Sequence, residues 1–274
     1  MATSFFQVVT DAINDVAEFG YESEERLAYW LTEIRQAAER DLISEGGLQA
    51  QLDRVLVATY QRLVDRGRVL QRHSGIARYT LEQLRPQLRA ELDRRIAASA
   101  NLIRLNRATA INETLQRFSG WASSVPAGGT DITNRREVKA NVRKSLAGLP
   151  FETRRVLVDQ SHKLSAAISD IVAMDQDAIG AEWHSHWRQQ NYQYRPEHKA
   201  RDGIVYPVKD SWAAQRRFVK ADEHGFYEDH ERAGEMIFCR CWIRWIYALR
   251  DMPKELLTDA GRRALADARA KVMA

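Results

Sequence analysis

The segment from Arg195 to Trp242, which begins RPEHKARDG and closes with FCRCW, holds most of the side chains in this chain that carry chemistry. Histidines, acids and the only 2 cysteines of the 274-residue chain gather in it. They are His198, Asp202, His224, Asp229, His230, Cys239 and Cys241. Such side chains bind transition metals, or perform acid–base chemistry when they lie close together. We therefore expect the functional site in this segment.

The composition predicts a soluble globular protein. Hydrophobic residues make up 45% and charged residues 28% of the chain, and the net charge of +4 is only mildly basic. No window approaches the ~18 uncharged apolar residues of a membrane-spanning helix, so we expect no membrane contact. The N-terminus lacks the basic start and small-residue cleavage site of a signal peptide, which favours the cytosol.

Helical periodicity dominates the chain before residue 175. We expect helices over 4–19, from 23 to the Gly46-Gly47 break, over 48–73, 80–118, 134–146 and 151–175. Pro86 predicts a kink early in the fourth of these helices, because proline removes a backbone donor and clashes with the preceding turn. The clearest break in the chain is SGWASSVPAGGT, from Ser119 to Thr130, where glycine, serine and proline cluster.

After Gly180 the apolar period changes from helical to alternating. The segments 181–188, 204–208 and 239–247 are predicted strands, and a last helix is predicted over 258–272. The sequence thus predicts an α+β fold, mainly α, with a small antiparallel sheet. The expected organisation is a helical, partner-binding arm (1–120), a linker or loop (121–133) and an α+β core with a C-terminal helix (134–274).

Cys239 and Cys241 are the strongest candidates for a metal site. At positions i and i+2 of one strand, both thiols would project from the same face and share one ion. Zinc takes four ligands, and His198 and His230 are the expected partners, with Asp202 as a further possibility. The alternative is that both cysteines are plain core residues packed beneath Trp245. His184 and His186 also form a pair, which we expect to be solvated or bound to neighbouring carboxylates.

A metal-dependent nuclease or related hydrolase is the alternative function. The segment DHERAGEMIFC, from Asp229 to Cys239, is partly similar to the His-Asn-His endonuclease pattern. That pattern continues with further histidine or asparagine ligands, whereas WIRWIYALRDMPKELL after Cys241 holds neither residue. The chain also has no Gly-x-Ser-x-Gly motif and no glycine-rich phosphate loop. We therefore expect no catalytic residue and no enzymatic activity.

Taken together, residues 150–247 resemble the C-terminal core of the tailed-phage head-morphogenesis family, which includes the minor head protein F of phage Mu. The family pattern has five elements, and all five occur in this chain in the expected order. They are Trp183 in AEWHSHW, Arg195 and His198 in RPEH, Asp202-Gly203, and Tyr206-Pro207; Cys239-Arg240-Cys241 completes the pattern. Family members often carry Pro and His shortly before the Cys-Arg-Cys, where this chain has Asp229-His230 and then AGEMIF.

The resemblance implies a minor capsid protein of the virion that is bound near the portal vertex. It would enter the head during assembly in the host cytoplasm, in one or several copies, and be delivered with DNA at ejection. The implied partners are the portal protein, the major capsid protein or packaged DNA. The long helix before Phe118 is our candidate for that contact, through Leu102 for protein and through Arg104 and Arg107 for acidic groups or DNA phosphates.

Overall fold

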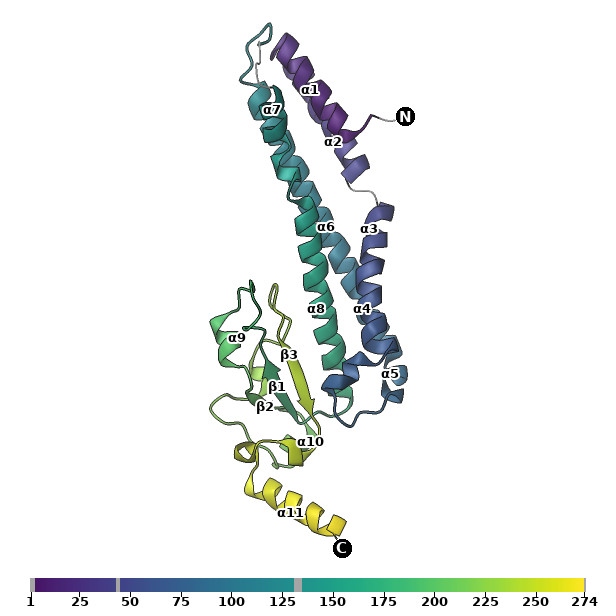
Figure 1. Cartoon of the computed structure of the whole chain (residues 1–274), viewed down its shortest axis with the longest axis vertical. Coiled ribbons are helices and arrows are strands. Elements are labelled where there is room, and N and C mark those ends of the chain that lie inside the picture. Colours follow the sequence, from purple (N-terminus) through teal and green to yellow (C-terminus); the bar gives the residue numbers. More distant parts are fainter. Residues whose placement is uncertain (1–2, 43–44, 131–134, 274) are drawn as a thin grey trace. The chain divides into compact units, whose positions relative to one another are not determined.

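The computed structural model describes residues 3–42, 45–130 and 135–273 and divides the chain into two compact units. Unit 1 comprises Met1–Arg54 and Ala97–Leu157, and unit 2 comprises Val55–Ile96 and Val158–Ala274. Two long helices, α6 (Arg85–Ala122) and α8 (Leu149–Asp175), each contribute one end to each unit (Figure 1). The predicted boundaries at residues 120 and 134 both fall inside unit 1.

Unit 1 is a helical body. It contains α1 (Phe5–Phe19), α2 (Glu24–Leu42), α3 (Glu45–Leu52), α7 (Arg135–Val142), η4 (Lys144–Leu146) and parts of α6 and α8. Helix α1 begins where the Ser4 side chain accepts a hydrogen bond from the Gln7 N–H, an N-cap that satisfies a free donor of the first turn. Its buried face, which includes Val9 and Ile13, packs with Ile34 of α2 and Phe118 of α6. The helical period predicted this element well.

The predicted linker is tied to the end of α1. Residues 121 and 122 still belong to α6, and residues 131–134 lie outside the described part of the chain. Between them, Gly128 N–H donates to Phe19 O (3.0 Å) and Thr130 N–H donates to Ala17 O (2.9 Å). Gly129 has a φ of +87°, and a Cβ there would meet Glu18 O at 2.3 Å, so only glycine fits this close approach.

Unit 2 begins with a helical segment that departs from the predicted single helix over 48–73. After α3 the turns are irregular: η1 (Asp53–Val57), α4 (Ala58–Tyr60), η2 (Gln61–Asp65) and η3 (Arg68–Arg72). Gly67, at a φ of +67°, separates the last two. A kink was expected at Pro86 within one helix; the structure has two helices there, since α5 (Tyr79–Gln83) ends at Leu84 and α6 begins at Arg85.

The sheet of unit 2 is antiparallel, as predicted. Its order is β2 (Val205–Pro207), β1 (Gly180–His184), β3 (Trp242–Ile246), with Trp183 of β1 opposite Ile243 of β3. The strand predicted over 181–188 is wrong beyond His184, because the Ser185 N–H leaves the ladder and donates to Asp202 Oδ1 (2.8 Å). The strand predicted from Cys239 begins only at Trp242.

The remaining elements of unit 2 are short. They are α9 (Pro196–Ala200), α10 (Trp212–Gln215), η5 (Tyr227–Asp229), η6 (Leu249–Asp251), η7 (Lys254–Leu256) and the final helix α11 (Asp259–Met273). One buried cluster joins Trp183 and Trp245 of the sheet with Tyr206 and both cysteines. None of the described helices is both long and apolar enough to cross a lipid bilayer.

Candidate metal centre

Three of the predicted ligands meet in unit 2. His198 lies in α9, and Cys239 and Cys241 lie in the segment that leads into β3. The His198 Nδ1 atom is 3.6 Å from Cys239 Sγ and 3.4 Å from Cys241 Sγ, and the three atoms all lie within 4.8 Å of one another. Zinc bonds of about 2.0–2.3 Å in a tetrahedron hold their donor atoms about 3.5–4 Å apart. The group could therefore hold a metal ion.

Burial separates these three side chains from solvent. His198 is 2% exposed, Cys239 0% and Cys241 5%. The Trp183 indole covers the imidazole edge-on, with ring centroids 5.4 Å apart. On another side, the Arg195 Nη2 group donates to Ile237 O (2.9 Å) and joins the start of α9 to the cysteine segment. The ligand set is thus enclosed by the core of the sheet.

A carboxylate orients the imidazole. His198 Nε2 lies 3.0 Å from Glu231 Oε1, and Arg201 donates to Glu231 Oε2 (3.1 Å). Burial raises the pKa of Glu231, but the hydrogen bond and charge of Arg201 outweigh it and the pKa is lowered overall. The ionised carboxylate accepts the Nε2 proton, so the Nδ1 lone pair faces both sulfurs. Metal-binding histidines in proteins are commonly held in this way.

The two thiols differ in acidity. The pKa of Cys239 is lowered to about 5, chiefly because the Cys241 thiol donates to its sulfur, and the Gly234 N–H adds a contact of 3.4 Å. The pKa of Cys241 is raised, because it donates that hydrogen bond and is buried. A bound cation favours the thiolate form of both sulfurs, so metal binding would release the proton they share.

Two buried donors beside Cys241 fit a charged sulfur. Trp183 Nε1 and Ser185 Oγ have no hydrogen-bond partner among the described nitrogen and oxygen atoms. Both act on the Cys241 sulfur in the direction that lowers its pKa. An unpaired buried donor is costly. A thiolate at Cys241 would give both donors an acceptor, which is how the surroundings fit a metal-bound cysteine pair.

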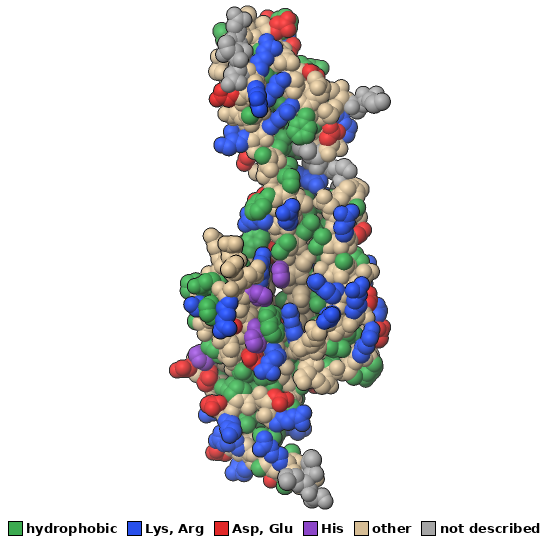
Figure 2. Space-filling view, viewed as in Figure 1, with side chains coloured by type: hydrophobic (Ala, Val, Ile, Leu, Met, Phe, Trp, Pro, Cys, Tyr) green, Lys and Arg blue, Asp and Glu red, His purple; other side chains and the backbone are tan. Residues whose placement is uncertain are grey.

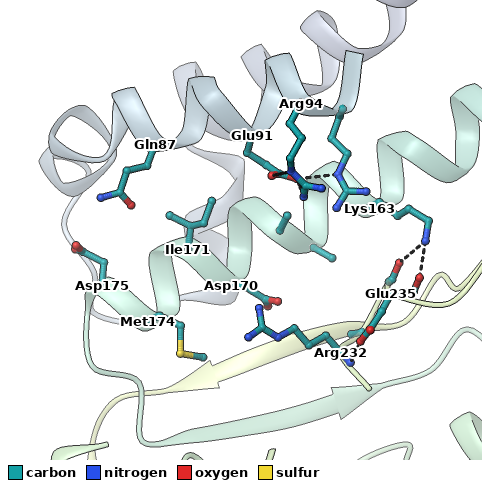
Figure 3. A pocket seen from close by; sticks show the side chains of 15 residues that line it. Gln87, Glu91, Arg94, Lys163, Asp170, Ile171, Met174, Asp175, Arg232 and Glu235 are labelled. Atoms are coloured by element: carbon teal, nitrogen blue, oxygen red, sulfur yellow. Dashed lines mark hydrogen bonds and ion pairs between the residues drawn. The ribbon is translucent and has the colours of Figure 1, made fainter. Parts of the chain in front are cut away.

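Helix α8 fixes the loop that carries the cysteines. The Phe238 N–H donates to Asp159 Oδ1 (2.7 Å). Lys163 Nζ donates to Glu235 O (2.5 Å), as Figure 3 illustrates. Phe238 adopts a φ of 59°, a left-handed conformation that is costly for an aromatic residue and needs such support. Gly234, at a φ of +85°, lies against α8 so closely that a Cβ would be 2.8 Å from that of Ala166.

The structure does not bring the other predicted ligands into this group. Within the described ranges, the only such group of histidine, cysteine or acid side chains is His198, Cys239 and Cys241. His230 Nε2 lies 2.7 Å from His224 O, while Asp202 accepts from Ser185 N and from Trp187 Nε1 (2.8 Å). His184 stacks on Trp242 with 4.1 Å between ring centroids, and its Nε2 lies 3.3 Å from Glu182 Oε1, a neighbouring carboxylate as expected.

The elements of the family resemblance meet at this site. Trp183 covers His198, the Gly203 N–H donates to Trp183 O (2.8 Å), and Tyr206 shares the buried cluster with both cysteines. No protein-family model, curated protein or solved structure matches the chain. The function of the protein must therefore be inferred from the geometry of this site and from the residues that resemble the family.

Glu231 is the important residue that sequence reasoning missed. It directly follows His230, which carried the expectation of a fourth ligand. An isolated glutamate in a charged stretch gives no signal that it will face an imidazole 33 positions away. Ser185 lies within the predicted strand 181–188, and that pattern gives no signal that its hydroxyl lies beside a cysteine.

A separate cavity of about 490 Å³ lies beside the cysteine loop, between α6, α8 and residues 232–235 (Figure 3). Burial raises the pKa of Asp170 on its wall to about 7, against the opposing charge of Arg232. Other cations on the wall already have partners, since Arg94 and Arg95 both bind Glu91. Because charges of both signs are balanced there, the cavity favours no ligand class.

Proposed function

We propose that His198, Cys239 and Cys241 bind one zinc ion in a structural site. Two sulfurs and one imidazole are a donor set that zinc accepts readily and that magnesium and calcium avoid. When bound, the ion would cross-link α9 to the start of β3. The observation that supports this proposal is the convergence of Nδ1 and both Sγ atoms, with Glu231 fixing the imidazole from behind.

The fourth ligand remains a sequence-based prediction. His230 is the predicted residue, and its imidazole would first have to leave the carbonyl oxygen of His224. Its ring packs edge-on against Tyr206, with 4.8 Å between the ring centroids, close to the buried cluster that holds the cysteines. A His230→Gln variant that retains full zinc affinity would exclude this residue as the fourth ligand.

The burial of the three ligands favours a structural role over a hydrolytic one. A catalytic zinc keeps a coordination position open to water and substrate. Here His198 and both cysteines are enclosed by the sheet core, and no other described acid or histidine joins their group. Cleavage of plasmid DNA by the purified protein with added Mg²⁺, Mn²⁺ or Zn²⁺ would contradict this conclusion.

On the same basis we propose that the protein is a phage minor head protein. The residues that resemble the family are not scattered, because Trp183, His198, Tyr206 and the cysteines form one buried unit. That coherence supports a shared structural core. The role would be that of a virion component near the portal vertex, bound to the portal or major capsid protein, with packaged DNA as a further partner.

The proposed protein contact lies on the part of α6 in unit 1. Leu102 and Leu105 are 41% and 64% exposed. Other apolar residues of the helix are buried, among them Leu88, Leu92, Ile103, Ile111, Leu115 and Phe118. Arg104 donates to Asn101 Oδ1 (3.2 Å), and burial lowers the pKa of Arg107. Exposed leucines beside arginines suit an apolar contact with a charged edge.

Metal analysis of the purified protein tests the site. We expect about one zinc per chain. His198→Gln should abolish stoichiometric binding, whereas His224→Gln, which changes a histidine outside the group, should retain it. Wild-type protein that contains no metal, takes up none on titration and is as stable with chelator as without it would refute the zinc site.

Incorporation into heads tests the proposed role. The protein is expressed with portal, scaffold and capsid proteins from the same genome, and assembled heads are isolated and examined for the chain. We expect the wild-type chain in heads and depletion of Leu102→Asp. Absence of the wild-type chain from heads that assemble normally would contradict the minor head role and leave the zinc result unaffected.

A further inference from the structure

A second cavity in unit 2 is lined by arginines and by no acid. It has a volume of about 600 Å³ and lies between the α4–η3 segment and α8. Arg62, Arg68 and Arg72 line it from one side and His162 from the other, together with serine, threonine, glutamine and apolar residues. None of the aspartates and glutamates that the structure describes is on this wall. This differs from the cavity of Figure 3, whose wall carries both acidic and basic side chains.

In the part of the chain that the structure describes, no acidic side chain forms an ion pair with Arg62, Arg68 or Arg72. Arg72 instead lies over the Trp242 ring, 4.9 Å from its centroid, and burial lowers its pKa. Like charges that share a partly buried cavity repel one another, and an anionic ligand would relieve that repulsion.

The charged neighbours of His162 indicate that the electrostatic potential in this cavity is positive. Its pKa is lowered first by burial and then by the charges of Arg240, His186, Arg72 and Arg62. These groups are all basic. In the space-filling view, histidine side chains (purple) lie close to Lys and Arg side chains (blue) (Figure 2). All 7 histidines of the chain belong to unit 2.

We propose that this cavity binds a phosphate group, carried either by a nucleotide or by a nucleic-acid strand. Guanidinium groups match phosphate oxygens with pairs of parallel N–H donors, and several of them in one cavity can bind a terminal phosphate with two charges or neighbouring phosphodiesters with one charge each. Ser165 on α8 adds a neutral hydroxyl to the same wall. A volume of about 600 Å³ admits a base and sugar as well as the phosphate. The inference does not depend on the proposed virion role.

Binding by the full-length protein tests the proposal with three probes: inorganic phosphate, AMP and a 12-nucleotide single-stranded DNA. Calorimetric titration at low and high salt gives the affinity for each. We expect saturable binding of at least one probe and a loss of about tenfold or more for the double variant Arg62→Gln/Arg68→Gln. These two arginines are exposed on the cavity rim, so the variant should fold. Arg72 is left intact because it packs on Trp242.

The control removes the same charge elsewhere in unit 2. Arg263→Gln/Arg269→Gln changes two exposed arginines of α11 and should bind each probe as the wild type does. Tight binding of AMP would identify a nucleotide. Binding of DNA alone, with a logarithmic salt slope that becomes shallower by about 0.7 for each phosphate that a variant no longer binds, would identify a strand. Absence of binding to all three probes, or equal weakening by both double variants, would overturn the proposal.

Discussion

Two buried groups of unit 2 should give it opposite responses to acid. His73 is 1% exposed, and its ring nitrogens lie 2.5 Å from the Tyr247 hydroxyl and 3.1 Å from Ser169 Oγ. Burial, aided by the charge of Arg72, lowers the pKa of His73 to about 3. Asp170 directly follows Ser169 in α8, and burial raises its pKa to about 7. Each shift makes folding depend on pH, with opposite sign.

The sign of each pH effect on stability depends on whether the folded or the unfolded state binds the proton. Below pH 6.5 the unfolded chain protonates His73 while the folded chain does not, so acid removes stability down to pH 3. Between pH 7 and 3.8 the folded chain protonates Asp170 while the unfolded chain does not, so acid adds stability. With about 1.4 kcal/mol per pKa unit, a change from pH 7 to pH 5 costs about 2 kcal/mol at His73 and gains about 2 kcal/mol at Asp170.

Single variants should separate the two contributions. Relative to the wild type, the free energy of unfolding of His73→Gln should rise by about 2 kcal/mol between pH 7 and pH 5, because only the acid-stabilising group remains. That of Asp170→Asn should fall by about 2 kcal/mol over the same interval. Urea unfolding can be followed by tryptophan fluorescence, since Trp183 and Trp245 are buried in unit 2. Chelator and reductant in all samples make the cysteine contribution common to the three proteins.

Each variant also loses hydrogen bonds and packing, which lowers its stability at both pH values. Comparing the change between pH 7 and pH 5 in the variant with that in the wild type cancels this loss. A lower stability of His73→Gln at pH 7 is expected and does not enter the comparison between pH values. If both variants follow the wild-type pH dependence within about 0.5 kcal/mol, the two groups titrate alike in the folded and unfolded states. The reasoning from burial would then be wrong for both.

The other predictions concern the loop, the metal and the proposed contact. Gly234→Ala should lower stability by about 1–3 kcal/mol and weaken metal binding, because its positive φ and the Ala166 contact exclude a Cβ; Gly120→Ala, in helix α6 with open space around its Cβ, should be neutral or stabilising in the same urea assay. Cys241→Ser should lower the zinc content measured by mass spectrometry, since it removes one of two sulfur ligands. Limited trypsin digestion should cut first near Arg135 or Arg136, and a primary cut within 80–117 would contradict this. Leu102→Asp should weaken capture by the portal protein at all salt concentrations, whereas an effect of Arg104→Glu should diminish at high salt.

The fold could be predicted where a period or a breaker acts locally. The apolar spacing of Val9 and Ile13 predicts α1, and Pro86 marks the start of α6 because its effect on the helix is confined to one turn. The strand limits failed for a different reason. The alternation AEWHSHWR is consistent with a strand through residue 188, but Asp202 captures the Ser185 N–H and ends the ladder. A side chain 17 residues away decides where the strand ends, and the local apolar pattern cannot predict that contact.

For the candidate site too, the sequence predicts features that depend on neighbouring residues and misses those that depend on distant contacts. Cys-x-Cys was assigned to one strand, where alternate side chains share a face. The cysteines precede β3 instead, and Phe238 in a left-handed conformation, with Asp159 and Lys163 of α8 holding the loop, brings both sulfurs to His198. The conclusion that the thiols converge therefore agrees with the structure although the reason given for it does not. Glu231 could not be foreseen either, because its role is defined only by the imidazole it faces. The residue types in a sequence indicate which class of site can form. Whether the site forms depends on backbone turns and on the hydrogen-bond partners of the ligands, and these come from elements far apart in the chain.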